Sequence, residues 1–249
     1  MVLHPLAQQF AAVAEAYERG RPEYPPAVVG ALTAELGVGA GGRVLDLAAG
    51  TGKLSRALLA GGFDVIAVEP LESMRELLIE RLGADRVNAG VAESIPLPDE
   101  SVDAVTVGDA FHWFDHALAL QEIRRVLRPH GGLAVLSTVP DWSGASWAHE
   151  LGTFVMSLRP EHPHFDGPPW EHTVRATPGW SEPREVRITT SVAAEPQRIV
   201  DHMASMSWIA GMEPTARSAA LARIGDLVRT GETPAQLPIH FVIGLTALT

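Results

Sequence analysis

The chain has 249 residues, of which 46% are hydrophobic, a formal net charge of -11 and no cysteine. So much apolar sequence can bury a full core, so we expect one large folded domain, or a domain with an inserted lid. The negative charge argues against nucleic acid and anionic membrane surfaces as partners, and the absence of cysteine excludes disulfides, thiolate metal sites and a cysteine nucleophile.

The sequence contains no segment with the pattern of a signal peptide or a membrane span. It has no basic start followed by an apolar run, and no apolar stretch of about 18 residues. We therefore expect a cytoplasmic protein that makes no use of a membrane.

Strand and helix patterns alternate through the first 140 residues, which is typical of a parallel sheet covered by helices. We predict strands near 43–48, 64–69, 86–90, 102–108 and 132–139. We predict helices near 5–18, 26–37, 53–61, 71–82 and 116–128.

After Asp141 the alternation stops. Four tryptophans and a stretch rich in proline and histidine interrupt it, so residues 141–183 are a candidate substrate lid above the carboxyl ends of the strands. Regular patterns resume with a strand at 184–192, helices across 196–210 and 214–230, and a last strand at 238–248.

The segment from Arg43 to Leu54 has the pattern of a nucleoside-binding loop. An apolar strand leads into small residues, so backbone can approach a ligand closely, and a helix begins near Lys53. A second apolar strand ends at Glu69, 19 positions after Gly50, close to the offset of about 20 at which such folds place an acid for ribose hydroxyls.

The loop matches neither common phosphate-binding motif. A dinucleotide fingerprint would need glycine or alanine at Ser55, and a P-loop would need glycine at Leu47 and Ser or Thr at Leu54. The remaining pattern is Asp46-x-x-x-Gly50-x-Gly52, whose acid suits an ammonium or sulfonium ligand better than a pyrophosphate.

Together with four further segments, this loop resembles the class I S-adenosylmethionine-dependent methyltransferases of small-molecule type. The first further segment, Tyr17 to Pro25, is similar to the one that precedes the first strand in that family. The others are Ala92-Glu93-Ser94-Ile95-Pro96-Leu97-Pro98, Asp109-Ala110-Phe111-His112-Trp113-Phe114 and the turn from Arg124 to Gly132. One departure is Ala48, where many relatives have glycine.

The resemblance implies an α/β fold: a Rossmann-like seven-stranded sheet, mostly parallel with a C-terminal antiparallel hairpin, helices on both faces and an inserted lid. We expect residues 1–249 to form a single methyltransferase domain. Its predicted parts are an N-terminal helical cover (1–37), a cofactor-binding core (38–140), the lid (141–183) and the C-terminal part of the sheet with helices (184–249).

The resemblance also implies S-adenosyl-L-methionine as cofactor and assigns residues to it. The predicted cofactor-binding residues are Tyr17, Arg21, Asp46, Ala48, Gly50, Gly52, Glu69, Pro70, Met74, Ala92, Glu93, Asp109, Ala110 and Trp113. Some of these assignments have a structural alternative: Asp46 could cap the loop, Glu69 could begin the next helix, Glu93 could face solvent, and the segment around Arg21 could be a surface turn stiffened by prolines.

His112 is the candidate catalytic residue, as a general base after the fourth strand. A structural or cofactor-facing role is the alternative that we favour, because no carboxylate is clearly placed to orient the ring. The histidines from His149 to His172 lack metal-ligand spacing, so no metal site is expected.

These features predict a methyltransferase that acts on a small-molecule acceptor; a homodimer is left open. The alternatives are an enzyme of the same fold that uses the cofactor for a non-methylating reaction such as cyclisation, a non-catalytic ligand-binding protein, and a nicotinamide-dependent oxidoreductase. The acceptor, and whether O, N or C is methylated, cannot be read from the sequence.

Overall fold

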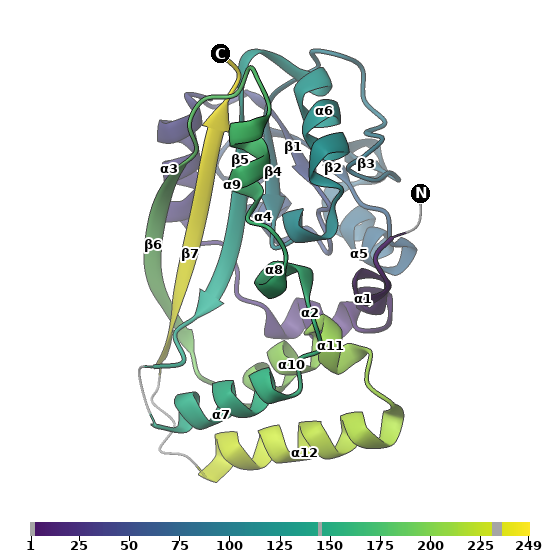
Figure 1. Ribbon diagram of the computed structural model, residues 1–249, viewed down its shortest axis with the longest axis vertical. Helices are drawn as coiled ribbons and strands as arrows, with labels where there is room; N and C mark the ends of the chain where they lie inside the picture. The colour runs from purple at the N-terminus through teal and green to yellow at the C-terminus, as the bar shows by residue number, and fades with distance from the viewer. Residues whose placement is uncertain (1–2, 144–145, 231–235) are drawn as a thin grey trace. The chain divides into compact units, whose positions relative to one another are not determined.

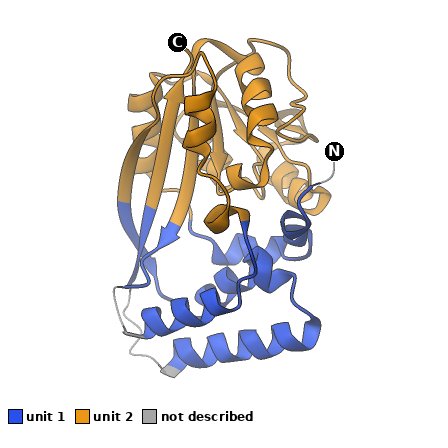
Figure 2. Ribbon diagram, viewed as in Figure 1, with its two compact units in different colours: residues 1–22, 139–162, 189–240 blue, residues 23–138, 163–188, 241–249 orange. Residues whose placement is uncertain are grey.

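The computed structural model describes residues 3–143, 146–230 and 236–249. The chain divides into two compact units (Figure 2). Unit 1 contains residues 1–22, 139–162 and 189–240, and unit 2 contains residues 23–138, 163–188 and 241–249. The predicted segments 1–37, 141–183 and 184–249 each include a few residues outside the described part, and the predicted division into one domain with these segments stays a prediction.

A seven-stranded sheet with the order β3-β2-β1-β4-β5-β7-β6 forms the centre of the fold (Figure 1). Its strands are β1 (Arg43–Leu47), β2 (Asp64–Val68), β3 (Val87–Asn88), β4 (Val102–Gly108), β5 (Leu127–Pro140), β6 (Arg184–Ala193) and β7 (Gln236–Ala247). Pairs among β1 to β5 are parallel, whereas β7 runs opposite to β5 (Figure 1). The predicted fold class is therefore confirmed.

Helices cover both faces of the sheet within unit 2. They are α3 (Pro26–Leu36), α4 (Lys53–Ala60), α5 (Glu72–Leu82), α6 (His116–Val126), α8 (Pro163–Asp166) and α9 (Trp170–Ala176), with the 3-10 turns η2 (Ala84–Arg86) and η3 (Phe111–Trp113). α6 packs with α9 in front of the sheet in Figure 1, whereas α4 packs with α3 and α5. The main core, between the sheet and α6, includes the fully buried Leu45, Val105 and Ile123.

The alternation of short apolar runs and amphipathic segments explains these elements, because strands covered on both faces read as continuous apolar runs. The register pairs Asp46 with Ala67 and with Thr106, so β1, β2 and β4 end at the same edge of the sheet. Loops that follow these strands therefore meet at one edge, which is where open α/β sheets bind ligands.

β5 begins earlier than the predicted 132–139. Val102 pairs with Leu127 but Ala104 pairs with Gly132, so the chain bulges between them, and His130 there has a φ of 64°. The bulge lies within the turn from Arg124 to Gly132 that the sequence predicted before the fifth strand.

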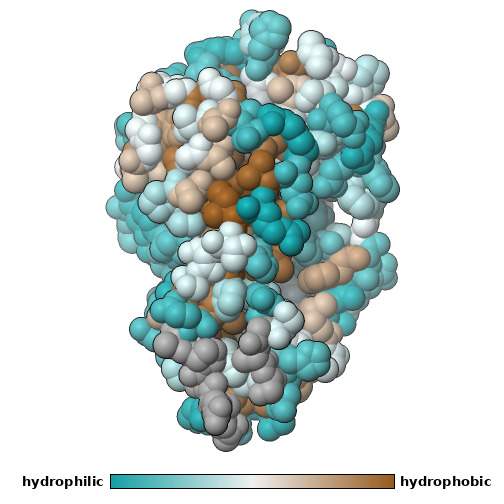
Figure 3. Space-filling view, turned by 90° about the vertical axis from the view of Figure 1, so that its left-hand side faces the viewer, coloured by the Kyte–Doolittle hydropathy of each residue, from teal (hydrophilic) through white to brown (hydrophobic). Residues whose placement is uncertain are grey.

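β6 forms an edge of the sheet, and its exposure alternates along the strand. Arg184, Glu185 and Arg187 are exposed on it, and charges of this kind discourage pairing with another strand. Figure 3 views the left-hand side of Figure 1, where hydrophilic residues surround hydrophobic ones near the middle of the face.

The helices of unit 1 are α1 (Pro5–Gln8), η1 (Gln9–Ala12), α2 (Ala14–Gly20), α7 (Ser146–Ser157), α10 (Pro196–Ala204), α11 (Ser207–Ala210) and α12 (Pro214–Thr230). The single helix expected over 5–18 is broken, because Val13 leaves the helical region with φ of -130° and ψ of 20°. α7, α8 and α9 also occupy the segment 141–183, where no regular element was predicted; α8 and α9 are too short to show a helical period.

Within the part of the chain that the structure describes, no helix is long and apolar enough to cross a membrane.

Candidate functional site

The loop after β1 holds three residues in left-handed backbone conformations. The φ angles are 58° at Ala48, 58° at Gly50 and 86° at Gly52. A Cβ on Gly50 would meet nothing within 4 Å, whereas one on Gly52 would lie 2.6 Å from Leu78 Cδ1 on α5. Gly50 thus leaves backbone open to a ligand, and Gly52 permits close packing of the next helix. Ala48 adopts the same region, which costs a residue with a Cβ about 1–2 kcal/mol.

Glu69, which directly follows β2, joins this loop to the next helix. Its Oε2 accepts a hydrogen bond of 2.8 Å from the amide of Gly50, and its Oε1 accepts one of 2.8 Å from the amide of Leu71, before α5. The side chain is buried. A carboxylate can accept about four hydrogen bonds, so its capacity for two more is unused, and a ribose diol donates two. The ribose role and the helix-start role predicted as alternatives are compatible in this geometry.

Asp46, the last but one residue of β1, is buried beneath the loop. Its Oδ2 accepts a hydrogen bond of 2.5 Å from Ser55 Oγ on α4. Ser55 is the residue that departs from the dinucleotide fingerprint, and the departure supplies a partner for this acid.

Both acids bind protons unusually tightly. Burial raises the pKa of Asp46 to about 7, against the hydrogen bond from Ser55, and the charge of Glu69 adds to the increase. Burial likewise raises the pKa of Glu69 to about 7, although the amides of Leu71 and Gly50 and the charge of Arg75 oppose it. Two buried carboxyl groups at the same edge of the sheet favour a cationic ligand, because a nearby positive charge stabilises their ionised forms.

Lys53, at the start of α4, is tied to the proline-bounded segment before β1. Its buried Nζ lies 2.5 Å from Glu23 Oε1, and Arg56 also pairs with Glu23 at 2.9 Å. Burial alone would raise the pKa of Glu23, but hydrogen bonds and charge from the two cations outweigh it and lower the pKa. The chain's one lysine is thus engaged in the structure that positions the loop.

The turn after β4 holds Asp109 and the predicted aromatic residues. Asp109 has a φ of 54°, and its Oδ1 accepts a hydrogen bond of 2.7 Å from the amide of Thr138 on β5. Ala110 is buried, and Trp113 packs on the core. The ring of His112 lies against that of Trp113, with centroids 4.5 Å apart and the planes tilted by 49°.

The predicted residues after β2 and β3 occupy distinct positions. Met74 on α5 and Ala92 are buried, and Pro70 is half-buried. The Glu93 carboxylate accepts a hydrogen bond of 2.9 Å from the amide of Asp115, the N-cap of α6. Its side chain therefore has a structural partner, which leaves the backbone at this position as the better candidate for contact with a ligand.

Tyr17 and Arg21 belong to unit 1: Tyr17 lies in the middle of α2, and Arg21 directly follows this helix. The guanidinium of Arg21 lies 5.3 Å from the centre of the Tyr17 ring, and its Nε donates to Ser205 Oγ at 3.1 Å. Gly20 lets α2 meet α10, because a Cβ on it would lie 2.1 Å from the amide nitrogen of His202.

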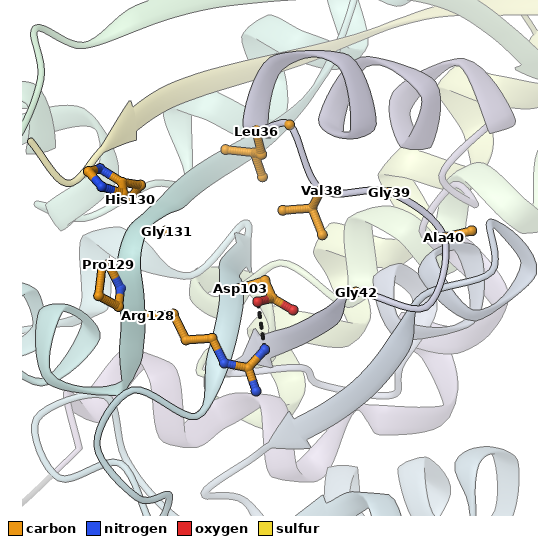
Figure 4. Close-up of a pocket in the computed structure, with 11 residues that line it drawn as sticks. Leu36, Val38, Gly39, Ala40, Gly42, Asp103, Arg128, Pro129, His130 and Gly131 are labelled. Carbon is orange, nitrogen blue, oxygen red and sulfur yellow. Dashed lines mark hydrogen bonds and ion pairs between the residues drawn. The ribbon is translucent and has the colours of Figure 1, made fainter.

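A pocket of about 360 Å³ lies at the amino ends of β1 and β4, the opposite edge of the sheet (Figure 4). Asp103 and Arg128 form an ion pair of 2.6 Å on its wall, and Val38 and Leu36 face it (Figure 4). It contains none of the predicted cofactor-binding residues.

The structure thus gathers Asp46, Ala48, Gly50, Glu69 and Asp109 at the carboxyl ends of three neighbouring strands. Sequence reasoning missed the roles of Ser55 and Glu23, and it missed the helix α8, which lies against η3. Of these, only Glu23 carried a signal, since it lies inside the segment Tyr17 to Pro25. Among the described residues, no group of three or more histidine and acidic side chains is placed to hold a metal ion.

Comparisons with known proteins agree with this geometry. The methyltransferase domain family matches residues 45–135. The chain is 36% identical to an uncharacterised methyltransferase of Mycobacterium tuberculosis over 225 residues, covering 90% of this chain and 87% of that protein. It is 31% identical to a demethylmenaquinone methyltransferase of Thermotoga maritima over 195 residues, which cover 75% of this chain and 78% of that protein. A solved structure described as a type II methyltransferase from Anaeromyxobacter dehalogenans matches with a TM-score of 0.62 and 26% sequence identity. The match covers 91% of this chain and 97% of that structure's chain.

The strand order, the antiparallel β7 and the glycine loop after β1 define a Rossmann-like methyltransferase. With relatives of this identity and coverage, the chain belongs to the class I S-adenosylmethionine-dependent methyltransferases. The resemblance predicted from the sequence is confirmed.

Proposed function

We propose that this chain binds S-adenosyl-L-methionine at the loop after β1 and transfers the methyl group to a small-molecule acceptor. The observation that carries the proposal is Glu69: a buried carboxylate that already fixes the loop at Gly50 and whose oxygens can accept two further hydrogen bonds.

The residues present fit the cofactor by their chemistry. Glu69 would accept hydrogen bonds from the two ribose hydroxyls, and the open backbone at Gly50 would allow close approach. Asp46 would act on the ammonium of the methionine part, since a cation stabilises its ionised form. Backbone at Ala92 and Glu93 would meet the adenine edge.

The remaining predicted contacts are assigned by family resemblance. Tyr17 and Arg21 would lie near the methionine carboxylate. The other predicted contacts are Ala48, Gly52, Pro70, Met74, Asp109, Ala110 and Trp113. In this proposal an aromatic ring at Trp113 would stabilise a sulfonium through a cation–π contact.

When bound, this cofactor supplies a methyl group that is already electrophilic. The chain's own residues then have two tasks: they align the acceptor atom with the S–CH₃ bond, and they exclude water. The name of the Thermotoga maritima relative supports a small-molecule acceptor, because demethylmenaquinone is a small molecule. A cytoplasmic location and a homodimer stay predictions.

A methyl-transfer screen tests the proposal. The protein is incubated with S-adenosylmethionine carrying a labelled methyl group and with sets of phenols, amines, carboxylic acids and quinols, and products are identified by mass spectrometry. We expect a labelled product and an equal amount of S-adenosylhomocysteine. Consumption of the cofactor without S-adenosylhomocysteine would instead indicate a non-methylating reaction, and a melting temperature that shifts with NAD alone would indicate an oxidoreductase.

A further inference from the structure

Arg125, near the end of α6, holds the loop that follows β3. Its guanidinium donates five hydrogen bonds, all of 2.8 Å, and five is the number of N–H groups that an arginine side chain carries. Two of them go to backbone carbonyls of the loop, at Ile95 and Leu97, and one goes to the carboxylate of Asp99. The other two go to the two oxygens of Glu122, three positions earlier on α6. All of these residues are in unit 2.

Glu122 holds the same loop from its own side. Its Oε2 accepts a hydrogen bond of 2.9 Å from the amide of Ile95, so the N–H and the C=O of Ile95 are both bonded to side chains of α6. The pair stays charged at neutral pH, because the hydrogen bonds from Arg125 lower the pKa of Glu122. We call Arg125 and Glu122 the α6 clamp.

The loop depends on such contacts for its shape, because residues 89–101 form no helix and no strand beyond one isolated bridge. A second anchor is the hydrogen bond of 2.9 Å from the amide of Asp115, the N-cap of α6, to the Glu93 carboxylate. The loop also packs on itself, since a Cβ on Gly90 would lie 2.6 Å from Cδ of Pro96. Side chains of other elements therefore decide where the backbone of this loop lies.

The amide of Ala92 connects this loop to ligand binding. Ala92 is 3% exposed, and its amide donates no hydrogen bond to any residue that the structure describes. A buried amide without an acceptor is costly, so such a group is normally satisfied by another partner, here by a ligand. In the proposed function the backbone at Ala92 meets the edge of adenine, which carries acceptor nitrogens.

We propose that the α6 clamp sets the selectivity of the site for adenine over 6-oxo purines, by holding the backbone at Ala92 in one position. The proposal rests on the proposed function. Arg125 and Glu122 are positioning residues in it, because they act through the loop and touch no ligand. Hypoxanthine has an N–H donor where adenine has an acceptor nitrogen, so a fixed amide would face another donor and reject it. A loosened loop can shift, and it then loses the distinction.

Lysine cannot replace Arg125 in this role. Its ammonium is a point charge with three donors, whereas the clamp uses five donors in the plane of a guanidinium. Arg125→Lys therefore keeps the charge and removes most of the contacts to the loop. The matched control is Arg128→Lys, which alters the ion pair with Asp103 at the opposite edge of the sheet (Figure 4).

Hydrogen exchange in the protein without ligands tests whether the clamp fixes the loop. We expect the peptide that covers residues 89–98 to exchange about tenfold faster in Arg125→Lys than in the wild type, with β4 unchanged. Arg128→Lys should leave this peptide unchanged. Equal exchange in Arg125→Lys and the wild type, or an equal increase throughout unit 2, would contradict a local role of the clamp.

Calorimetry with two ligands tests selectivity: S-adenosylhomocysteine, and S-inosylhomocysteine, in which a 6-oxo group replaces the 6-amino group. We expect the wild type and Arg128→Lys to prefer the adenine compound by about 10–100-fold. In Arg125→Lys, S-adenosylhomocysteine should bind about tenfold more weakly, and S-inosylhomocysteine within about twofold of the wild type. The preference should therefore fall about tenfold, which a general loss of structure would not produce.

The other outcomes separate the two proposals. Equal weakening of both compounds in Arg125→Lys, or equal affinity of the wild type for both, would overturn the selectivity and leave the proposed function standing. Absence of binding of either compound to the wild type would instead overturn the proposed function. If Arg125→Lys does not fold, Glu122→Gln decides, because its amide group cannot accept all three hydrogen bonds of the carboxylate. Its preference for adenine should fall in the same direction, and an unchanged preference would overturn the proposal.

Discussion

The two buried acids of the site should make the stability of the ligand-free protein fall as pH rises. Each tenfold change in proton affinity is worth about 1.4 kcal/mol. The pKa of Asp46 rises from 3.8 to about 7, which corresponds to a penalty of about 4 kcal/mol once the group is ionised in the folded state. For Glu69, whose pKa rises from 4.5 to about 7, the penalty is about 3 kcal/mol.

The sign follows from proton binding. Between about pH 4 and 7 the folded protein holds protons on these acids that the unfolded chain has already released, so the free energy of unfolding decreases with rising pH. Below that window both states are protonated, and above about pH 7 both are ionised and the penalty is constant.

Urea unfolding of the wild type and of Asp46→Asn at a series of pH values between about 5 and 8 measures this effect. Because asparagine does not titrate, the difference in unfolding free energy between variant and wild type should change in favour of the variant by about 3 kcal/mol, most of it between about pH 5 and 7. Curves that stay parallel over the whole range would show that burial does not raise the pKa of Asp46.

Three further predictions concern packing, the lid and His112. Gly20→Ala should lower the free energy of unfolding in urea by at least about 2 kcal/mol, because the added Cβ would overlap the backbone of His202. The control Gly30→Ala should be neutral or stabilising, because a Cβ there meets nothing within 4 Å. Equal effects of the two substitutions would contradict the close contact between α2 and α10. Trp142→Ala should change acceptor kinetics and leave cofactor affinity within a few-fold, and an equal loss of both would place this residue in the common core. His112→Ala should lower kcat by less than the 10²–10⁴-fold expected of a base and should also weaken cofactor binding; a thousand-fold loss with unchanged affinity would make His112 the base.

Much of the fold could be predicted because its signals are local. Apolar runs such as the one that ends at Val68, followed by Glu69, indicate both a buried strand and the place of its terminal acid. The helices from Pro26, Glu72 and His116 begin and end within about two residues of the predictions, because each has an amphipathic or apolar face and a terminating residue. The loop after β1 was also recognisable from its glycines, and Gly50 and Gly52 both occupy left-handed backbone conformations.

The contacts that could not be predicted join residues far apart in sequence. The hydrogen bond from Ser55 to Asp46 and the ion pairs of Glu23 with α4 depend on how helices pack on the sheet, which no local pattern encodes. The return of His164 to the turn after β4 also depends on the path of the intervening chain. In the lid, short helices flanked by prolines carry too little periodicity to be recognised.

The most direct test of the account is a calorimetric titration of S-adenosylhomocysteine into the wild type and into Glu69→Gln at neutral pH. We expect the wild type to bind one equivalent with measurable heat and Glu69→Gln to bind about 5–150-fold more weakly, because one charge-assisted acceptor of the ribose hydroxyls is lost. Glu93→Gln, in which the amide oxygen can still accept from Asp115, should bind like the wild type. Binding to Glu69→Gln that equals the wild type, or no heat with any of the three proteins at millimolar ligand, would contradict the placement of the cofactor at the loop after β1.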